Sequence, residues 1–192
     1  MNASDEELLA AVAGGDREAF AEIYRRRRPD VYRFAVHMTG SASAAEDVTQ
    51  DVFITVIHEA RRYDPRRAAA VSWLLGIARN HARRRTTERP TDALSEAAGK
   101  TPSADASALD GLVRAQQIDS VRRALFTLPA TYREVIVLCD LQELSYADAA
   151  AALGCALGTV RSRLHRGRAM LAERLRVAPR MVGRWPTRDW VL

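Results

Sequence analysis

Five arginines and one serine lie along one stretch of the C-terminal half, GTVRSRLHRGRAMLAERL at residues 158–175. Arginine donates a planar fork of hydrogen bonds that matches guanine O6 and N7, and serine and further arginines can anchor phosphate groups. The candidate DNA-contacting side chains in this stretch are Thr159, Arg161, Ser162, Arg163, His165, Arg166 and Arg168. Their types and spacing predict contacts to DNA, with Arg161 in the first turn of a helix and Arg166 more than a turn further along.

Two short helices joined by a sharp turn must position these side chains. Ser145 and Asp148 are predicted to cap a helix over residues 145–153, and Gly154 suits the left-handed residue that ends a helix. A second helix over residues 157–176 carries one apolar face, formed by Val160, Leu164, Leu171 and Leu175. This order predicts a helix-turn-helix whose second helix enters the major groove. The alternative is a basic amphipathic helix with a solvated arginine face.

Positive charge is concentrated in the same part of the chain. The formal net charge is +5 and the pI about 9.7, which favours a polyanionic partner. Residues 114–192 contain 13 arginines and seven acidic residues. Residues 1–90 contain 15 arginines and 13 acidic residues, and residues 91–113 contain one basic residue, Lys100, and four acidic residues. The 28 arginines against a single lysine also fit a GC-rich genome, so arginine content alone does not identify the partner.

Several other classes of protein are disfavoured by what the sequence lacks. The apolar runs are too short to span a bilayer, and the N-terminus lacks the apolar region of a signal peptide. Cys139 and Cys155 form no CxxC motif, and the four histidines are scattered. We find no carboxylate cluster, nucleophile–base pair or phosphate-binding loop. We therefore expect a cytoplasmic protein with no membrane insertion, no metal, no cofactor and no enzymatic activity.

Helical spacing of apolar residues recurs along the N-terminal half, which predicts an all-α fold. Capping residues are predicted at the starts of three helices: Ser4 with Glu7, Asp16, and Ser43 with Glu46. Pro29 predicts a kink in the second helix. The expected core stripes of the second and third helices are Phe20, Ile23, Tyr24, Val31, Ala35, Val48, Val52, Val56 and Ile57. A fourth helix over residues 69–85 is expected to bury Trp73, Leu74, Ile77 and Ala78.

A change of composition divides the chain into two helical domains. Residues 86–110, TTERPTDALSEAAGKTPSADASALD, have no sustained apolar stripe and predict a flexible linker. Beyond them the helical stripe resumes at Ile118, Val121, Leu125 and Leu128, and Pro129 breaks it. The predicted division is a first domain over 1–88, a linker over 89–111, a second domain over 112–178 and a tail over 179–192. Trp185 and Trp190 of the tail have no predicted role.

Two blocks of sequence resemble extracytoplasmic-function sigma factors of RNA polymerase. LPATYREVIVLCDLQELSYADAAAALG followed by GTVRSRLHRGRAML resembles their region 4, which binds the promoter −35 element. AEDVTQDVFITVIHEARRYDPRRAAAVSWLLGIARNHARRR resembles their region 2. The two blocks occur in the family's order and cover nearly all of residues 5–176. Ala156 departs from the pattern, because the family often has proline just before the recognition helix.

The resemblance implies an alternative sigma factor that binds core RNA polymerase and directs promoter recognition, melting and transcription initiation at a stress- or signal-responsive regulon. Its implied partners are the β′ clamp helices and β flap of the polymerase, promoter DNA and an anti-sigma factor. The implied polymerase-binding face consists of Asp47, Gln50, Asp51 and Ile54, which follow i, i+3, i+4 and i+7 spacing. A solvated helix face is the alternative for these four residues.

The resemblance also implies a surface that captures the melted −10 strand. Its residues are Tyr63, Arg66, Arg67, Arg79, Asn80, Arg83 and Arg84. The loop over residues 63–70 matches the family's base-capture loop in position, but its AAAVS is poorer in aromatic residues than usual. Trp73 is expected in the core rather than as a stacking platform for a base.

A regulator that binds DNA without polymerase could use the same helix-turn-helix. Such proteins usually couple it to a receiver or ligand-binding domain, and the N-terminal half has no predicted strands for a receiver. Promoter elements two helical turns apart need a reach of roughly 70 Å, at about 34 Å per turn. An extended linker of this length reaches about 78 Å, whereas a random coil spans only about 26 Å. The linker must therefore be held extended on a promoter. One hypothesis is that its acidic residues lie in a channel of the polymerase, and the alternative is a passive, solvated tether.

Overall fold

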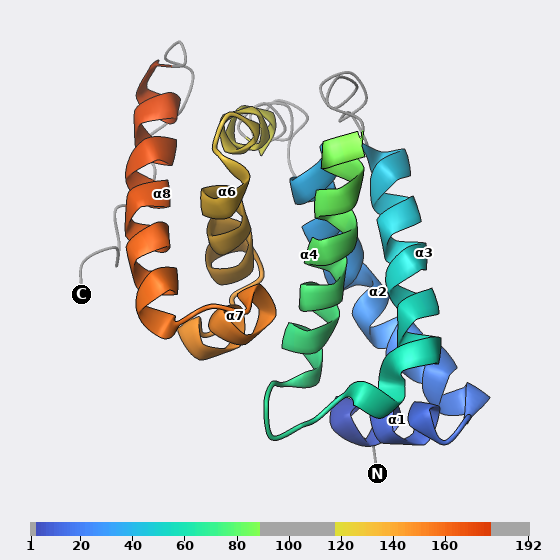
Figure 1. Ribbon diagram of the computed structural model, residues 1–192. Helices are drawn as coiled ribbons and strands as arrows, with labels where there is room; N and C mark the ends of the chain where they lie inside the picture. The colour runs from blue at the N-terminus through green and yellow to red at the C-terminus, as the bar shows by residue number, and fades with distance from the viewer. Residues whose placement is uncertain (1–2, 89–117, 178–192) are drawn as a thin grey trace, which may run out of the picture.

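The computed structural model describes residues 3–88 and 118–177, and the regular elements in both ranges are helical (Figure 1). The all-α prediction is therefore confirmed for this part of the chain. The predicted linker over 89–111 and tail over 179–192 lie outside the described residues. In chain order the elements are α1 (Asp5–Ala13), α2 (Arg17–Thr39), α3 (Ala42–Glu59), a 3₁₀ turn η1 (Ala60–Arg62), α4 (Ala70–Glu88), a helical segment over 118–126, α6 (Ala130–Ile136), a π-helical segment η2 (Val137–Leu141), α7 (Tyr146–Leu153) and α8 (Leu157–Val177).

Local side-chain chemistry starts the first two helices as the sequence predicts. The N–H of Glu7 donates to Ser4 Oγ over 3.1 Å, and the N–H of Ser4 donates to the Glu7 carboxylate over 2.7 Å. The carboxylate of Asp16 accepts hydrogen bonds from the N–H groups of Glu18 and Ala19. Each cap satisfies donors that the first turn leaves without partners.

The predicted capping box of the third helix is wrong. Gly40, at φ 75°, ends α2, and Ser41 follows directly as the cap of α3 by accepting from the N–H of Ala44. Ser43 therefore lies inside the helix, and Glu46 forms an ion pair with Arg28 instead. Helix α3 begins earlier than predicted because Gly40, in the left-handed conformation, reverses the chain within one residue. Ser41, the first serine after it, therefore occupies the N-cap position.

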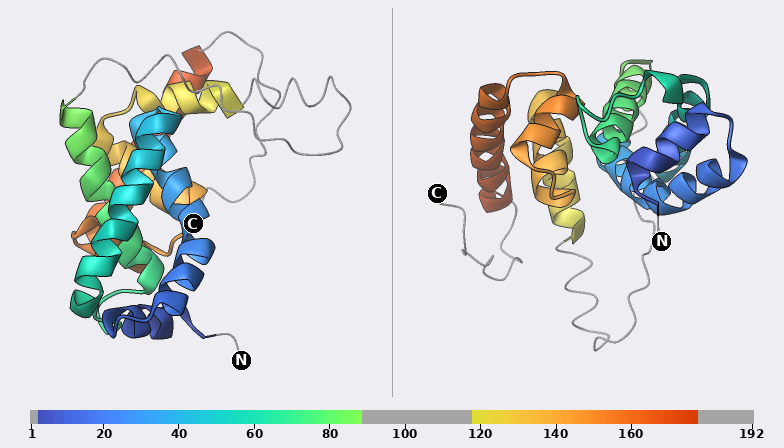
Figure 2. Two further views of the ribbon diagram at one scale, coloured as in Figure 1. Left: turned by 90° about the vertical axis from the view of Figure 1, so that its right-hand side faces the viewer. Right: turned by 90° about the horizontal axis from the view of Figure 1, so that it is seen from below.

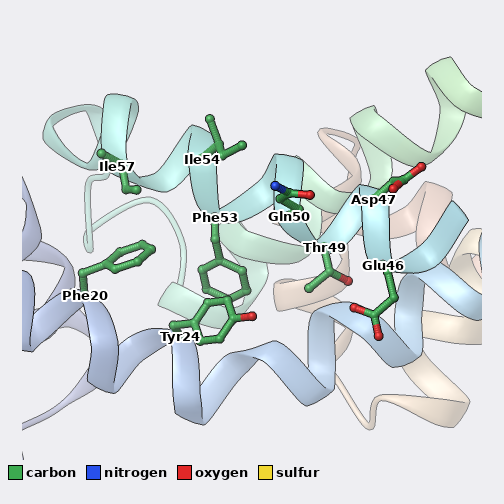
Figure 3. A pocket seen from close by; sticks show the side chains of 9 residues that line it. All are labelled: Phe20, Tyr24, Glu46, Asp47, Thr49, Gln50, Phe53, Ile54 and Ile57. Atoms are coloured by element: carbon green, nitrogen blue, oxygen red, sulfur yellow. The ribbon is translucent and has the colours of Figure 1, made fainter. Parts of the chain in front are cut away.

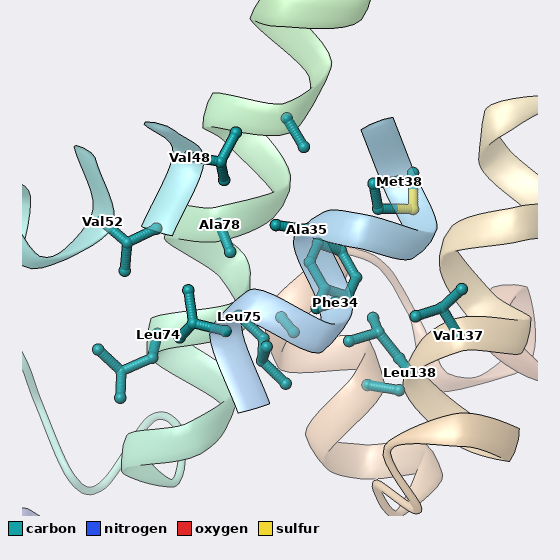
Figure 4. Packing of buried hydrophobic residues seen from close by; sticks show 14 of the residues in the cluster. Phe34, Ala35, Met38, Val48, Val52, Leu74, Leu75, Ala78, Val137 and Leu138 are labelled. Carbon is teal, nitrogen blue, oxygen red and sulfur yellow. The ribbon is translucent and has the colours of Figure 1, made fainter. Parts of the chain in front are cut away.

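The first four helices enclose a core to which α2, α3 and α4 contribute most (Figure 4). Phe34 of α2, Val52 of α3 and Leu74 of α4 are almost completely buried. Other residues of the predicted stripes are less buried: Tyr24 is 38% exposed and Ile57 is 53% exposed, and Phe20, Trp73 and Ile77 are half-buried. The apolar stripes of α2 and α3 therefore include side chains that no other part of the described chain buries.

Close contact between α6 and α8 builds the C-terminal half. Val160 and Leu164 of α8 are buried, as the apolar face predicts. Gly167 permits the approach, because a Cβ atom there would lie only 3.0 Å from Ile136 Cδ1. The first half of the apolar face of α8 is thus buried, while Leu171 and Leu175 are half-buried, and the basic side chains lie on the other faces.

The two halves of the described chain share one continuous core. Leu138 and Val137 of η2 lie beside Phe34 and Met38 of α2 (Figure 4). Helices α6 and α7 lie on the same side of α4 in two perpendicular views (Figures 1 and 2), and both contact it. Two helical domains were predicted, and here they pack directly against each other.

Candidate functional site

The turn of the predicted helix-turn-helix has the geometry that the sequence indicates. Ser145 caps α7 by accepting from the N–H of Asp148 over 3.1 Å. Gly154 ends that helix at φ 61°, ψ 40°, where its N–H reaches the carbonyl groups of the last turn. Residues with a Cβ atom rarely adopt this left-handed conformation. The glycine turn therefore fixes the angle at which α8 leaves the motif.

Replacing Gly154 by alanine is expected to lower the free energy of unfolding by about 1–2 kcal/mol, because alanine is strained at positive φ. Gly158→Ala is the matched control, since Gly158 is helical and a Cβ atom there would meet nothing within 4 Å. This control should leave stability unchanged or raise it by up to about 1 kcal/mol. Urea denaturation followed by circular dichroism measures both. Equal effects at the two positions would contradict the assignment of the turn.

The predicted DNA-contacting residues lie on the outer faces of α8. Arg161, Ser162, His165 and Arg166 are exposed, whereas Thr159 and Arg163 are half-buried. Because α8 begins at Leu157, Arg161 is its fifth residue and starts the second turn, not the first as predicted. Arg161, Arg163 and Arg166 make no ion pair within the two described ranges. These guanidinium groups are therefore available to an outside partner.

Arg168 differs from its neighbours on α8. Its guanidinium forms two hydrogen bonds with the Asp140 carboxylate, at 3.2 and 2.7 Å, which join α8 to η2. Hydrogen bonding to this carboxylate raises the pKa of Arg168. A DNA contact by Arg168 remains a prediction, and in this structure the side chain supports the helix-turn-helix itself.

The loop that precedes α4 is held by its own hydrogen bonds. Tyr63 donates its hydroxyl to the carbonyl oxygen of Ala68 over 3.0 Å, and its ring lies 5.3 Å from that of Trp73, centroid to centroid. Burial raises the pKa of Tyr63 to about 12. Trp73 is partly buried and packs against the core, as expected. At the end of the loop, the N–H of Ala70 donates to the Glu6 carboxylate of α1.

The other residues predicted to bind the −10 strand fall into two groups. Arg66 and Arg67 of the loop are exposed, as are Asn80 and Arg84 of α4. Arg79 and Arg83 lie on the side of α4 that faces α6. The predicted set therefore spans the loop and the last turns of α4. Its first group is open to solvent, and Arg83 of the second group is still 46% exposed.

Glu134 of α6 is the partner of Arg79 and Arg83, and it was not predicted from the sequence. Its carboxylate lies 2.9 Å from Arg79 Nε and 3.2 Å from Arg83 Nε, and its side chain is 0% exposed. An acidic residue directly before the apolar stretch VIVL was the available signal, because such a charge is buried only when it is paired. Its partners could not be read from spacing, since they lie in the other half of the chain.

The predicted polymerase-binding face lies along α3. Asp47, Gln50 and Ile54 are exposed and border an open pocket of about 380 Å³ (Figure 3). Aromatic and apolar side chains from α2 and α3 also line the pocket, and the sequence reading did not assign them to this face: Phe20, Tyr24, Phe53 and Ile57. An exposed apolar patch bordered by acidic residues is typical of a protein-docking surface.

One arginine of α4 joins the acidic residues of this face. Arg85 donates to the carboxylates of Asp47 and Asp51 over 2.6 and 3.0 Å. Asp51 is half-buried as a result and does not line the pocket. The four predicted residues thus share one face, with the two carboxylates already bound to α4.

Within residues 3–88 and 118–177, no group of three or more His, Cys, Asp or Glu side chains could hold a metal ion. In the same part of the chain, no helix has the length and apolar character needed to cross a membrane.

Comparison with known proteins identifies the two helical regions. Residues 23–89 match the family described as Sigma-70 region 2, and residues 118–171 match Sigma-70, region 4. The chain is 37% identical over 181 residues to the ECF RNA polymerase sigma factor SigE of Mycolicibacterium smegmatis, covering 90% of this chain and 69% of that protein. It is 38% identical over 177 residues to SigM of Mycobacterium tuberculosis, covering 90% of this chain and 85% of that protein.

Solved structures agree with the sequence relatives. CnrH, in complex with the cytosolic domain of CnrY, matches with a TM-score of 0.69 and 25% identity, over 91% of this chain and 98% of that one. RpoE of Bartonella quintana, in complex with the anti-sigma factor NepR, matches with a TM-score of 0.63 and 29% identity, over 83% and 98%.

Sigma-70 regions 2 and 4 in one helical chain define the class as RNA polymerase sigma factors. Within that class, the chain belongs to the extracytoplasmic-function family. It is an alternative sigma factor that binds core RNA polymerase and directs promoter recognition and transcription initiation, and it is not an enzyme.

Proposed function

We propose that α8 reads the −35 element in the major groove, while α4 and the loop before it hold the melted −10 strand. The face of α3 around Asp47, Gln50, Asp51 and Ile54 docks on the β′ clamp helices, and the C-terminal half contacts the β flap. In this proposal region 2 occupies residues 1–88 and region 4 residues 112–178. The proposed linker and tail are residues 89–111 and 179–192.

The exposure of the α8 arginines is the observation that carries this proposal. Arg161 and Arg166 are exposed on the helix that follows the glycine turn, and Val160 and Leu164 on its apolar face are buried. A guanidinium held on a rigid helix can reach guanine or phosphate without first breaking an ion pair. The face of α3 offers a different chemistry, because Ile54 is 45% exposed and borders an acidic and aromatic pocket.

Regulation by an anti-sigma factor and a cytoplasmic location are part of the proposal. The matched structures of CnrH and of Bartonella quintana RpoE are complexes, and the latter contains an anti-sigma factor. We propose that a partner of the same class controls this chain in the cytoplasm, where core polymerase and promoter DNA are found. The regulon is then the set of promoters that respond when this partner releases the sigma factor.

A gel shift with and without core RNA polymerase tests whether promoter binding depends on the enzyme. The probe is a promoter taken from transcripts whose start sites appear after overexpression of this chain. We expect the holoenzyme to bind it at least about 100-fold more tightly than the free chain, since non-specific affinities are about 10⁻⁴–10⁻⁶ M and specific ones about 10⁻⁸–10⁻¹¹ M. A scrambled probe is the control. Tight, specific binding by the free chain would favour a regulator that acts without polymerase.

A further inference from the structure

The loop before α4, residues 63–69, contains a hydrogen-bonded turn. The N–H of Arg67 donates to the carbonyl oxygen of Asp64 over 3.0 Å, and the N–H of Arg66 donates to the Asp64 carboxylate over the same distance. Pro65 follows Asp64, at a position of the turn that its fixed φ favours. The tip of the loop, which carries the two exposed arginines, is therefore ordered by its own backbone.

Helix α1 is hydrogen-bonded to the chain on both sides of this loop. On one side, the Arg61 guanidinium of η1 donates to the carbonyl oxygen of Ala13, at the end of α1, over 3.0 Å. On the other side, the N–H of Ala70, the first residue of α4, donates to the Glu6 carboxylate over 3.2 Å. Helix α1 lies beside η1 at the end of the helical bundle from which the loop extends (Figure 1). The two contacts are about 10 Å apart along α1, at roughly 1.5 Å per residue, so α1 bridges the ends of the loop.

The contact at Glu6 supplies a cap that α4 lacks in its own sequence. Ala69 occupies the N-cap position, because its carbonyl oxygen accepts the first hydrogen bond of the helix, from the N–H of Trp73. Alanine has no side-chain oxygen for the N–H groups of the first turn and is unfavourable at this position. The Glu6 carboxylate accepts from the N–H of Ala70 and also places negative charge at the positive end of the helix dipole. The position of α1 therefore determines how the loop enters α4.

Helix α1 is itself anchored to α2, independently of the loop. Asp5 is only 8% exposed, and its carboxylate forms ion pairs with Arg26 and Arg27. Leu9 is completely buried in the core. Glu6, next to Asp5 in the sequence, is half-buried. Its carboxylate is therefore attached to a fixed helix and differs in this from a mobile surface group.

We infer that Glu6 is a positioning residue for base selection in the −10 element: by capping α4 from α1, it fixes the loop in the arrangement that accepts the preferred base. This inference rests on the proposed role of the loop in holding the −10 strand. A loop that is already ordered loses little conformational entropy when an extruded base enters, so its contacts can discriminate between bases. A displacement of about 1 Å is enough to lose such contacts. Helix α1 precedes the residues matched as region 2, which begin at residue 23.

Two substitutions at Glu6 separate the hydrogen bond from the charge. Glu6→Ala removes the acceptor, whereas Glu6→Gln keeps an amide oxygen that can accept from the same N–H. Glu7→Ala is the matched control, because Glu7 is the exposed neighbour of Glu6 and accepts from the N–H of Ser4 at the start of α1. In this control the Ser4 hydroxyl can still accept from the N–H of residue 7 and cap α1. Circular dichroism and pull-down of β′ establish that each full-length variant folds and forms holoenzyme.

Transcription from a library randomised across the −10 element measures base selection. The templates derive from the promoter found by start-site mapping, and each carries a transcribed barcode, so that sequencing the RNA gives the activity of every −10 sequence. We expect Glu6→Ala holoenzyme to lose at least about 5-fold of its discrimination at the −10 position held by the loop, the low end of the range for a lost base contact. Glu6→Gln should retain most of this discrimination, and Glu7→Ala should retain all of it.

A further variant, Arg66→Ala with Arg67→Ala, separates the inference from the function on which it rests. It should lower transcription from all templates, because both loop arginines are proposed to hold the strand. If it does so while folded Glu6→Ala keeps the wild-type base preference, positioning by Glu6 is wrong and the proposed −10 surface stands. An equal loss on all templates with Glu6→Ala, or equal effects of Glu6→Ala and Glu7→Ala, would also overturn the inference, because only stability would have changed. Wild-type transcription by the arginine variant would overturn the proposed role of the loop instead.

Discussion

Reversing the charges at Asp47 and Asp51 is expected to abolish binding to core RNA polymerase and, with it, transcription in a reconstituted system. Both carboxylates lie on the α3 face beside the apolar pocket, where a partner would desolvate them. Loss of a buried charge pair at an interface costs about 2–5 kcal/mol. Two arginines in these positions would add repulsion if the partner is basic. Pull-down of β′ by the Asp47→Arg, Asp51→Arg double variant measures the loss.

The fold should tolerate this change. Asp47 and Asp51 pair with Arg85 at the surface, and an exposed pair contributes at most about 1 kcal/mol. Glu59→Arg with Glu173→Arg is the matched control, because it changes the net charge equally on faces with no proposed role. The control should retain β′, and both proteins should keep their helical circular dichroism. Undiminished pull-down by the Asp47, Asp51 variant would place the docking face elsewhere.

Arg161→Ala and Arg166→Ala should impair promoter use in different ways. Arg161 lies near the start of α8, where residues of a recognition helix reach base edges. Loss of a bidentate base contact costs about 1–3 kcal/mol, or about 5- to 150-fold, and relaxes the preference at one base pair. Arg166 lies further along the helix and is expected to contact the phosphate backbone of the DNA. Its loss should weaken all sequences alike and reduce the log–log salt slope by about 0.9.

A library randomised across the −35 element, transcribed by core polymerase with each variant, measures both effects together. Arg174→Ala is the control, because Arg174 is exposed near the end of the same helix, beyond the proposed contacts. It should retain the wild-type base preference. If Arg161→Ala and Arg166→Ala both keep wild-type activity and preference, α8 does not read the promoter.

Features set by a few neighbouring residues were predictable from the sequence. The caps at Ser4, Asp16 and Ser145 depend on a side chain and an N–H group two or three residues away, so the residue type decides them. Gly154 was predictable for the same reason. The predicted cap at Ser43 was wrong because Ser41, two residues earlier, can accept the same hydrogen bond. Gly40 ends α2 and so places Ser41 at the N-cap of α3.

Features that depend on distant parts of the chain were not predictable. A helical stripe at Tyr24 and Ile57 shows that a helix has an apolar face, but not whether this chain or another protein covers it. The contact of Glu134 with Arg79 depends on how two helical units pack, which no spacing within either unit encodes. Spacing likewise placed the residues proposed to bind polymerase on one face without showing that Arg85 joins two of them to α4.

The shared guanidinium of Arg85 has a thermodynamic consequence. Arg85 joins α3, which is proposed to bind polymerase, to α4, which is proposed to bind DNA. A partner that binds the carboxylates on α3 therefore also changes the electrostatic environment of α4. If core polymerase donates hydrogen bonds to the carboxylates of Asp47 and Asp51, Arg85 loses its partners and α4 gains an unpaired cation. Any resulting increase in DNA affinity must appear equally as an increase in polymerase affinity when DNA is bound, since linkage between two sites is reciprocal.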